Sequence, residues 1–123
     1  MDRTTFQNMN DRLGTYFQAA VDQELAAWPT PRPQVTCTRG AWEGGYRIGY
    51  GLLNYSHLPL ERLEGVLMIQ HKEHGDGEQV SDVIGAMVFP AEVAADLDMI
   101  AAIAVAAIRI HLQRRTALLA VAG

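Results

Sequence analysis

The sequence predicts a single α+β domain over residues 1–123, with the element order α-β-β-β-β-α. Three observations predict it: apolar residues at helical spacing near both ends of the chain, strand-like alternation between them, and a length that suits one domain. We expect a four-stranded, mostly antiparallel sheet, with the N- and C-terminal helices packed on one of its faces.

The first helix is predicted over residues 4–28. Thr4 and Gln7 have the spacing of a capping box, and apolar residues then recur at steps of three and four. Trp28 precedes a proline, which disfavours helical backbone, so the helix should stop there. Prolines at alternate positions predict a stiff, extended connector over 29–33; the alternative interpretation is a ligand for an SH3-like groove.

The segment 34–55 is predicted to form a β-hairpin. Gly44-Gly45 suits a two-residue turn with positive φ, and polar and apolar residues alternate on both sides of it. Folding about this turn sets Trp42 against Arg47. The hairpin then has one apolar face and one face that carries Trp42, Arg47 and several glycines.

A second hairpin is predicted over residues 63–89, with its turn at Asp76-Gly77. A slip of one residue would exchange the two faces of its strands, so another register stays open. The preferred register makes three pairs: Ile69 with Ile84, Leu67 with Ala86, and His71 with Asp82.

The last helix is predicted over residues 90–118. Pro90 suits the first helical position, and acidic residues precede basic ones along the segment, which complements the helix dipole. Apolar residues cover most of its circumference, so it should be buried on more than one side. A second apolar stripe should pack either on the N-terminal helix or on a second copy of the chain, and we predict the second copy, in a homodimer. The predicted dimer-interface residues are Met99, Ile103, Ala106 and Ile110.

The outer face of the first hairpin is the candidate partner-binding surface. Its glycines leave a flat patch where another backbone can approach, and Trp and Arg dominate the energetics of protein interfaces. The alternative is a cation–π pair that serves only the fold. The candidate partner-binding residues are Arg39, Trp42, Arg47, Gly49 and Gly51.

Residue patterns that carry catalysis or bind metals are weak in this sequence. His71 and His74 would point to opposite faces of one strand, which is poor spacing for chelation. Cys37 has no activating neighbour in sequence. His71 opposite Asp82 would make an oriented base, but a cross-strand polar pair explains the two residues equally well. We therefore predict no enzyme, with no catalytic residue, metal or cofactor.

Composition excludes further classes of protein. Fourteen acidic residues against ten basic ones give a net charge of −4, which argues against direct nucleic-acid binding. The longest apolar run, 99–108, is too short to cross about 30 Å of hydrocarbon, so no membrane association is expected. The polar N-terminus lacks the pattern of a signal peptide, and a single cysteine excludes an intramolecular disulfide, so we expect a cytoplasmic protein. Nine arginines against one lysine indicate a GC-rich bacterial or phage genome.

These observations predict a non-enzymatic protein-interaction module of chaperone, adaptor or inhibitor type. Small acidic α+β proteins include secretion chaperones and phage-encoded inhibitors such as anti-CRISPR proteins. By this analogy of size and charge, one alternative is a phage- or mobile-element-encoded inhibitor of a host system. A second alternative is a small-ligand binder or modest enzyme, with a pocket between sheet and helices and with His71, Asp82 or His57 at its mouth. A third is a phage structural protein whose termini order on assembly.

Overall fold

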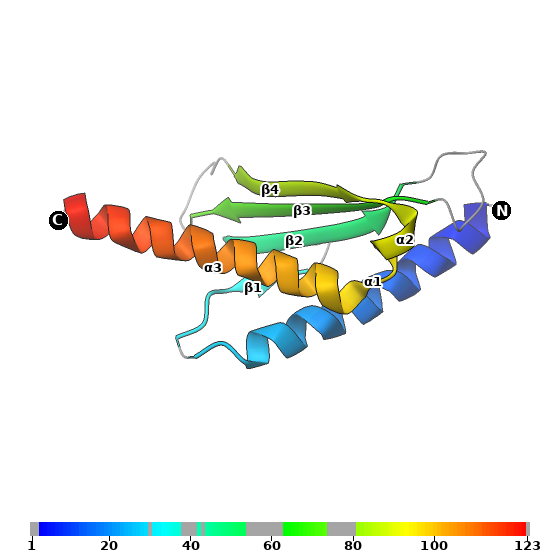
Figure 1. Ribbon diagram of the computed structural model, residues 1–123, viewed down its shortest axis with the longest axis horizontal. Helices are drawn as coiled ribbons and strands as arrows, with labels where there is room; N and C mark the ends of the chain where they lie inside the picture. Colours follow the sequence, from blue (N-terminus) through cyan, green and yellow to red (C-terminus); the bar gives the residue numbers. More distant parts are fainter. Residues whose placement is uncertain are drawn as a thin grey trace.

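The fold combines two long helices with a four-stranded sheet (Figure 1). The computed structural model describes residues 3–29, 31–37, 42, 44–53, 63–73 and 81–122. The elements in chain order are α1 (Arg3–Ala26), β1 (Val35–Thr36), β2 (Gly45–Leu52), β3 (Gly65–Lys72), β4 (Asp82–Phe89), α2 (Ala91–Ala94) and α3 (Leu97–Ala122). The predicted α+β class, element order and packing of both long helices on one face are confirmed.

The sheet is mixed, with the strand order β1-β2-β3-β4. β2 pairs antiparallel with β3, and β3 with β4, but β1 runs parallel to β2, with Val35 opposite Tyr46. The predicted hairpin over 34–55 is therefore wrong. Alternation of polar and apolar residues is the same in parallel and antiparallel strands, so it could not reveal the direction of β1.

The glycine pair predicted to form a hairpin turn instead leads into β2. Both residues do have positive φ, 151° at Gly44 and 83° at Gly45. A Cβ on Gly45 would lie 2.7 Å from the carbonyl oxygen of Gln34, and the next residue, Tyr46, donates its N–H to that same oxygen. The glycine thus allows the close approach that starts the parallel pairing.

The second predicted hairpin is confirmed as the antiparallel pair β3–β4, with His71 opposite Asp82 as expected. The other two predicted pairs are wrong by one residue, since Leu67 lies opposite Met87 and Ile69 opposite Gly85. The cause is a β-bulge, which places the extra residue Ile84 in β4. The predicted turn at Asp76-Gly77 lies outside the described residues.

The single helix predicted over 90–118 is wrong, because the chain breaks it into α2 and α3. The Asp96 side chain accepts a hydrogen bond from the backbone N–H of Met99 at 3.3 Å, which makes Asp96 the N-cap of α3. Acidic residues are predicted to lie early in one helix, and one of them, Asp96, begins a second helix instead. α1 ends at Ala26, where Arg32 of the connector donates to the carbonyls of Ala26 and Trp28.

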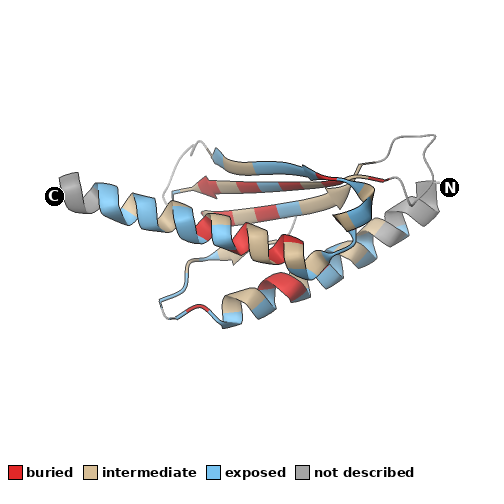
Figure 2. Ribbon diagram, viewed as in Figure 1, coloured by how far each residue is buried: buried red, intermediate tan, exposed pale blue. Residues whose placement is uncertain are grey.

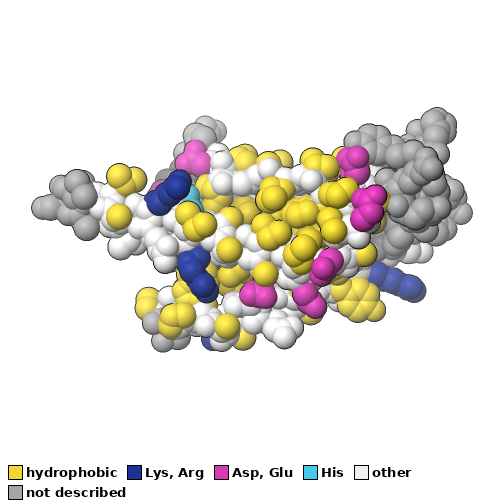
Figure 3. Space-filling view, viewed as in Figure 1, with side chains coloured by type: hydrophobic (Ala, Val, Ile, Leu, Met, Phe, Trp, Pro, Cys, Tyr) yellow, Lys and Arg dark blue, Asp and Glu magenta, His cyan; other side chains and the backbone are white. Residues whose placement is uncertain are grey.

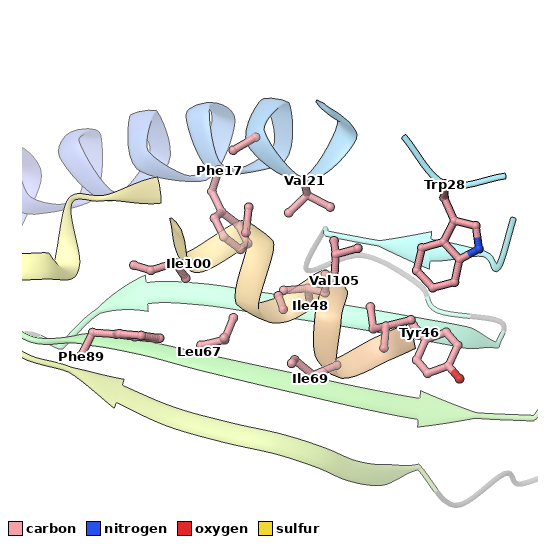
Figure 4. Close-up of a cluster of buried hydrophobic side chains, with 14 residues drawn as sticks. Phe17, Val21, Trp28, Tyr46, Ile48, Leu67, Ile69, Phe89, Ile100 and Val105 are labelled. Carbon is pink, nitrogen blue, oxygen red and sulfur yellow. The ribbon is translucent and has the colours of Figure 1, made fainter. Parts of the chain in front are cut away.

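The core fills the space between the two long helices and the inner face of the sheet (Figures 2 and 4). Alternate residues of β2 and β3 point into it, and residues at helical spacing on α1 and α3 meet them. Each fully buried large apolar side chain contributes about 1.5–3 kcal/mol to stability. The largest fully buried side chains are Val21, Ile48, Leu67, Ile69, Ile100 and Ile108, and Phe17, Tyr46 and Ala104 are buried with them.

Candidate functional site

The outer face of the sheet, turned away from α1 and α3, is the first candidate site. Residues directly opposite each other in antiparallel strands point to the same side of a sheet. We name this surface the open sheet face and define it by three rows across β2, β3 and β4. The rows are Arg47, Gln70 and Val83; Gly49, Met68 and Ala86; and Gly51, Val66 and Val88.

The open sheet face exposes large apolar side chains. Met68, Val83 and Val88 are 41%, 57% and 59% exposed, and none of the described helices covers them. The solvated face of an antiparallel sheet normally carries polar residues. Here only Arg47 and Gln70 are polar within the three rows. An exposed apolar surface that continues across three strands is typical of a protein interaction site.

Trp42 adds an aromatic corner to one end of the open sheet face. The ammonium nitrogen of Lys72 lies 4.8 Å from the centroid of the Trp42 ring, and the guanidinium carbon of Arg47 lies 6.0 Å from it. Lys72 also donates a hydrogen bond to the Trp42 carbonyl. The indole Nε1 is buried and has no hydrogen-bond partner in the described part of the chain. A buried donor without an acceptor costs about 1–3 kcal/mol, so this corner gains from any acceptor that reaches it.

The predicted partner-binding residues are partly reassembled by the structure. Arg47, Gly49 and Gly51 share the open sheet face, and Trp42 lies beside it, although β1 pairs parallel to β2 and does not form the predicted hairpin. Arg39 lies outside the described residues. The sequence interpretation missed the contribution of β3 and β4. Alternation along β3 was the available signal, because it sets Val66, Met68, Gln70 and Lys72 opposite to the buried residues.

A cluster of Tyr46, His71 and His111 forms the second candidate site, on the inner face at the Trp42 end of the sheet. The hydroxyl of Tyr46 hydrogen-bonds to Nδ1 of His111 at 2.8 Å. The His71 ring centroid lies 4.7 Å from that of Tyr46 and 4.9 Å from that of His111. The cluster therefore joins β2, β3 and α3 through three side chains.

The electrostatic surroundings favour the neutral form of both imidazoles. Burial lowers the pKa of His71 and of His111, and the nearby Arg115 lowers both further; for His71 the charge of His111 adds to this. Glu73 and Asp82 act in the opposite direction. Arg115 forms an ion pair with Glu73, which holds these two charges at the rim of the cluster.

The burial of its side chains limits the reactions that this cluster could catalyse. His71 is only 9% exposed, and Tyr46 is buried beside it. A general base must reach the proton that it removes, directly or through one water molecule. His71 and Asp82 are cross-strand neighbours as predicted, but Asp82 is exposed while the imidazole is buried, and no hydrogen bond joins these two described side chains. The cluster therefore forms a polar contact that holds α3 against the sheet.

Other chemistry-bearing residues give little support to catalysis. Burial, followed by the charge of Asp22, raises the pKa of the Cys37 thiol to about 11, so it stays protonated at neutral pH. Within the described residues no three His, Cys, Asp or Glu side chains come together as a metal site. His57 and His74 lie outside those residues.

Two hollows border α1. One of about 430 Å³ lies beside β2 and is lined by Asn10, Asp11 and Tyr50 among others. The second, about 770 Å³, lies where the ends of α1 and α3 diverge, with Arg109 placed 4.8 Å over the ring of Trp28. Neither His71 nor Asp82 is among the described residues that line them, so the expected ligand pocket with these residues at its mouth gains no support.

Comparisons with protein-family models, with curated proteins and with solved structures find no match for this chain. Within the described residues, no helix combines the length and the hydropathy that crossing a membrane requires. The assignment of function therefore depends on the surfaces described above.

Proposed function

We propose that this chain is a non-enzymatic protein-interaction module, of chaperone, adaptor or inhibitor type, that binds a partner protein on the open sheet face. The observation that carries the proposal is the exposure of Met68, Val83 and Val88 on a sheet face that no described helix covers. Burial of these side chains releases water from apolar surface, which is the main driving force of association.

The size of this driving force follows from the exposed fractions. A fully exposed Met or Val gains about 1.5–3 kcal/mol when it is buried, and the three side chains are 41–59% exposed. Their burial contributes about 2–5 kcal/mol together. Trp42 and Arg47 at the edge of the surface are of the residue types that contribute most in protein interfaces.

The apolar and charged residues of the surface indicate which kind of partner segment would bind it. An apolar segment that carries a carboxylate at one end would match the apolar rows and the cations Arg47 and Lys72. We propose a protein rather than a nucleic acid, because a net charge of −4 disfavours a polyphosphate ligand. A reducing cytoplasm suits a chain with one cysteine. An inhibitor encoded by a phage or mobile element would be one form of the same module.

The experiment is partner capture by the immobilised protein, read by quantitative mass spectrometry, from the cells that express it. The variants are Met68→Lys, Trp42→Ala and Arg47→Ala, and the control is Leu118→Lys, which changes an exposed apolar residue of α3 outside the open sheet face. We expect a specific protein to be captured by the wild type and the control, and at least tenfold less by the three variants. Equal capture by all four variants would refute the proposal.

A further inference from the structure

One flank of α3 is apolar although neither α1 nor the sheet covers it fully. Arg109 points toward Trp28 at the end of α1, and His111 points toward the sheet, so these two directions are occupied. Helical periodicity places a third set of residues on the remaining side. We name this set the α3 stripe: Met99, Ile103, Ala106 and Ile110. Met99 and Ile103 are half-buried, Ala106 is exposed, and Ile110 is 52% exposed.

The edge of β4 lies near this flank. β4 is the last strand in the sheet order, and no described strand pairs with its outer edge. Tyr46 donates its backbone N–H to the carbonyl of Gln34 on the β1 side, so its pair with His71 of β3 is not hydrogen-bonded. Hydrogen-bonded and non-hydrogen-bonded pairs alternate along antiparallel strands. Followed across β3, this alternation directs the backbone N–H and C=O of Ala86 and Val88 in β4 away from β3. β4 contains neither proline nor lysine, the residues that usually protect such an edge.

The α3 stripe and the β4 edge share one side of the molecule. α3 packs over β3 and β4, whereas α1 packs against β2 and against the opposite flank of α3 (Figure 1). Figure 3 shows hydrophobic side chains gathered over the first half of α3 and the strands beside it. The side therefore offers two features at once: unpaired backbone in the sheet layer and apolar side chains in the helix layer.

We infer that a second copy of this chain binds here, with its β4 pairing antiparallel to β4 and its α3 packing antiparallel to α3. One two-fold axis generates both contacts, because it reverses the direction of β4 and of α3 in the second copy. Each element therefore meets its own copy in the antiparallel direction. Met99 of one copy then faces Ile110 of the other. Ala106 lies close to the axis, where its small side chain lets the two helices approach. The result is one continuous eight-stranded sheet.

The charges of α3 are complementary to themselves in this arrangement. Asp96 precedes its first turn and Arg114 lies in its second half, and helical periodicity places both next to the α3 stripe. Antiparallel packing brings the acidic end of each helix to the basic part of the other, and it also opposes the two helix dipoles. In the face shown in Figure 3, Asp and Glu side chains lie mainly beside the first turns of α3, and Lys and Arg mainly beside its second half.

The dimensions predict a dimer that dissociates on dilution. The α3 stripe is about 16 Å long, and the helix layer and the sheet layer lie about 10 Å apart. A contact of this length that covers both layers buries about 400–600 Å² of surface per copy. Stable complexes bury about 800 Å² per partner, so this contact lies toward the weak end. The expected mass is twice 13.5 kDa at high concentration and approaches 13.5 kDa on hundredfold dilution.

The experiment measures mass by light scattering coupled to size-exclusion chromatography, from about micromolar to about 100 µM protein. Ala106→Glu and Ala106→Lys each place like charges across the axis, so each variant alone should be monomeric throughout. An equimolar mixture of the two should regain the dimer mass, because opposite charges then meet. Since Ala106 is exposed, circular dichroism should show an unchanged fold for both.

The strand contact has its own variant, Ala86→Pro, which removes an outward-pointing N–H and should also give a monomer. Leu118→Glu, elsewhere on α3, and Met68→Lys, on the open sheet face, should leave the dimer intact. A wild-type monomer at every concentration overturns the inference. So does a dimer that survives Ala86→Pro and both Ala106 variants, or a mixture that stays monomeric. A wild-type chain that stays monomeric but still captures its partner would overturn this inference alone and leave the proposed function standing.

Discussion

Met68 and Ile69 are consecutive residues of β3 that point to opposite faces of the sheet, and truncation of each to alanine tests the assignment of those faces. Ile69 is 2% exposed and packs in the core, whereas Met68 is 41% exposed on the open sheet face. The two substitutions have the same strand context and remove side chains of similar size. Any difference in their effect therefore reports the environment on each side of the sheet.

The expected magnitudes differ by several kcal/mol. Ile69→Ala removes buried methyl groups and leaves a cavity beneath α3, which should lower the free energy of unfolding by about 2–5 kcal/mol. For a chain of this length that corresponds to a fall in Tm of roughly 10–20 °C. Met68→Ala loses only partial contacts with its neighbours on the sheet surface, so its free energy of unfolding should fall by less than about 1 kcal/mol.

The assay is urea unfolding followed by circular dichroism, at a protein concentration low enough for the monomer to dominate. The slope of the free energy against urea should be the same in both variants, so that the midpoints compare stability directly. A loss of stability in Met68→Ala equal to that in Ile69→Ala would refute the reasoning. It would mean that the outer face is packed within the monomer, and the proposed partner surface would not be free to bind.

Three further predictions concern the residues that stabilise the fold around the candidate sites. The pKa values of His71 and His111 are lowered from 6.5 in the folded protein, so the unfolded chain binds protons more readily. The free energy of unfolding should therefore fall as the pH drops below about 6.5. Urea titrations at stepped pH measure this dependence, and His71→Gln should weaken it. Asp96→Ala removes the N-cap of α3 and should cost about 1 kcal/mol in thermal unfolding, whereas Asp96→Asn should restore most of it. Gly45→Ala places a Cβ 2.7 Å from the Gln34 carbonyl oxygen at a φ of 83°, so it should lower Tm by several degrees and weaken β1 pairing in amide hydrogen exchange, and an unchanged Tm would contradict the close approach.

The elements of this fold could be predicted because they depend on short-range patterns. Three- and four-residue spacing located α1 and most of α3, and alternation located β2, β3 and β4. The direction of β1, the bulge at Ile84 and the break at Asp96 could not be predicted in the same way. Each of these depends on which backbone groups meet across the fold, and the residues involved are compatible with either outcome.

The candidate site could be predicted in part for a similar reason. Trp42, Arg47 and the glycines of β2 stand out as residue types, so they were found from the sequence. The apolar residues of β4 do not, because this strand is apolar on both sides: Val83, Ala86 and Val88 lie on the outer face, and Met87 and Phe89 on the inner one. No periodicity within such a strand tells which side a helix covers, and only the placement of α3 decides it.

β4 contributes to both proposed surfaces, which couples them. The side chains of Val83 and Val88 belong to the open sheet face, while the outward backbone groups of Ala86 and Val88 form the edge that a second copy would pair. Pairing of the two edges makes the open sheet faces continuous across the two-fold axis and places two copies of the partner surface side by side. A partner with two matching segments would then bind with an effective local concentration that the monomer cannot provide. Ala106→Glu, which leaves the open sheet face unchanged, should therefore weaken capture of such a partner, whereas a partner with one segment should bind the variant as well as it binds the wild type.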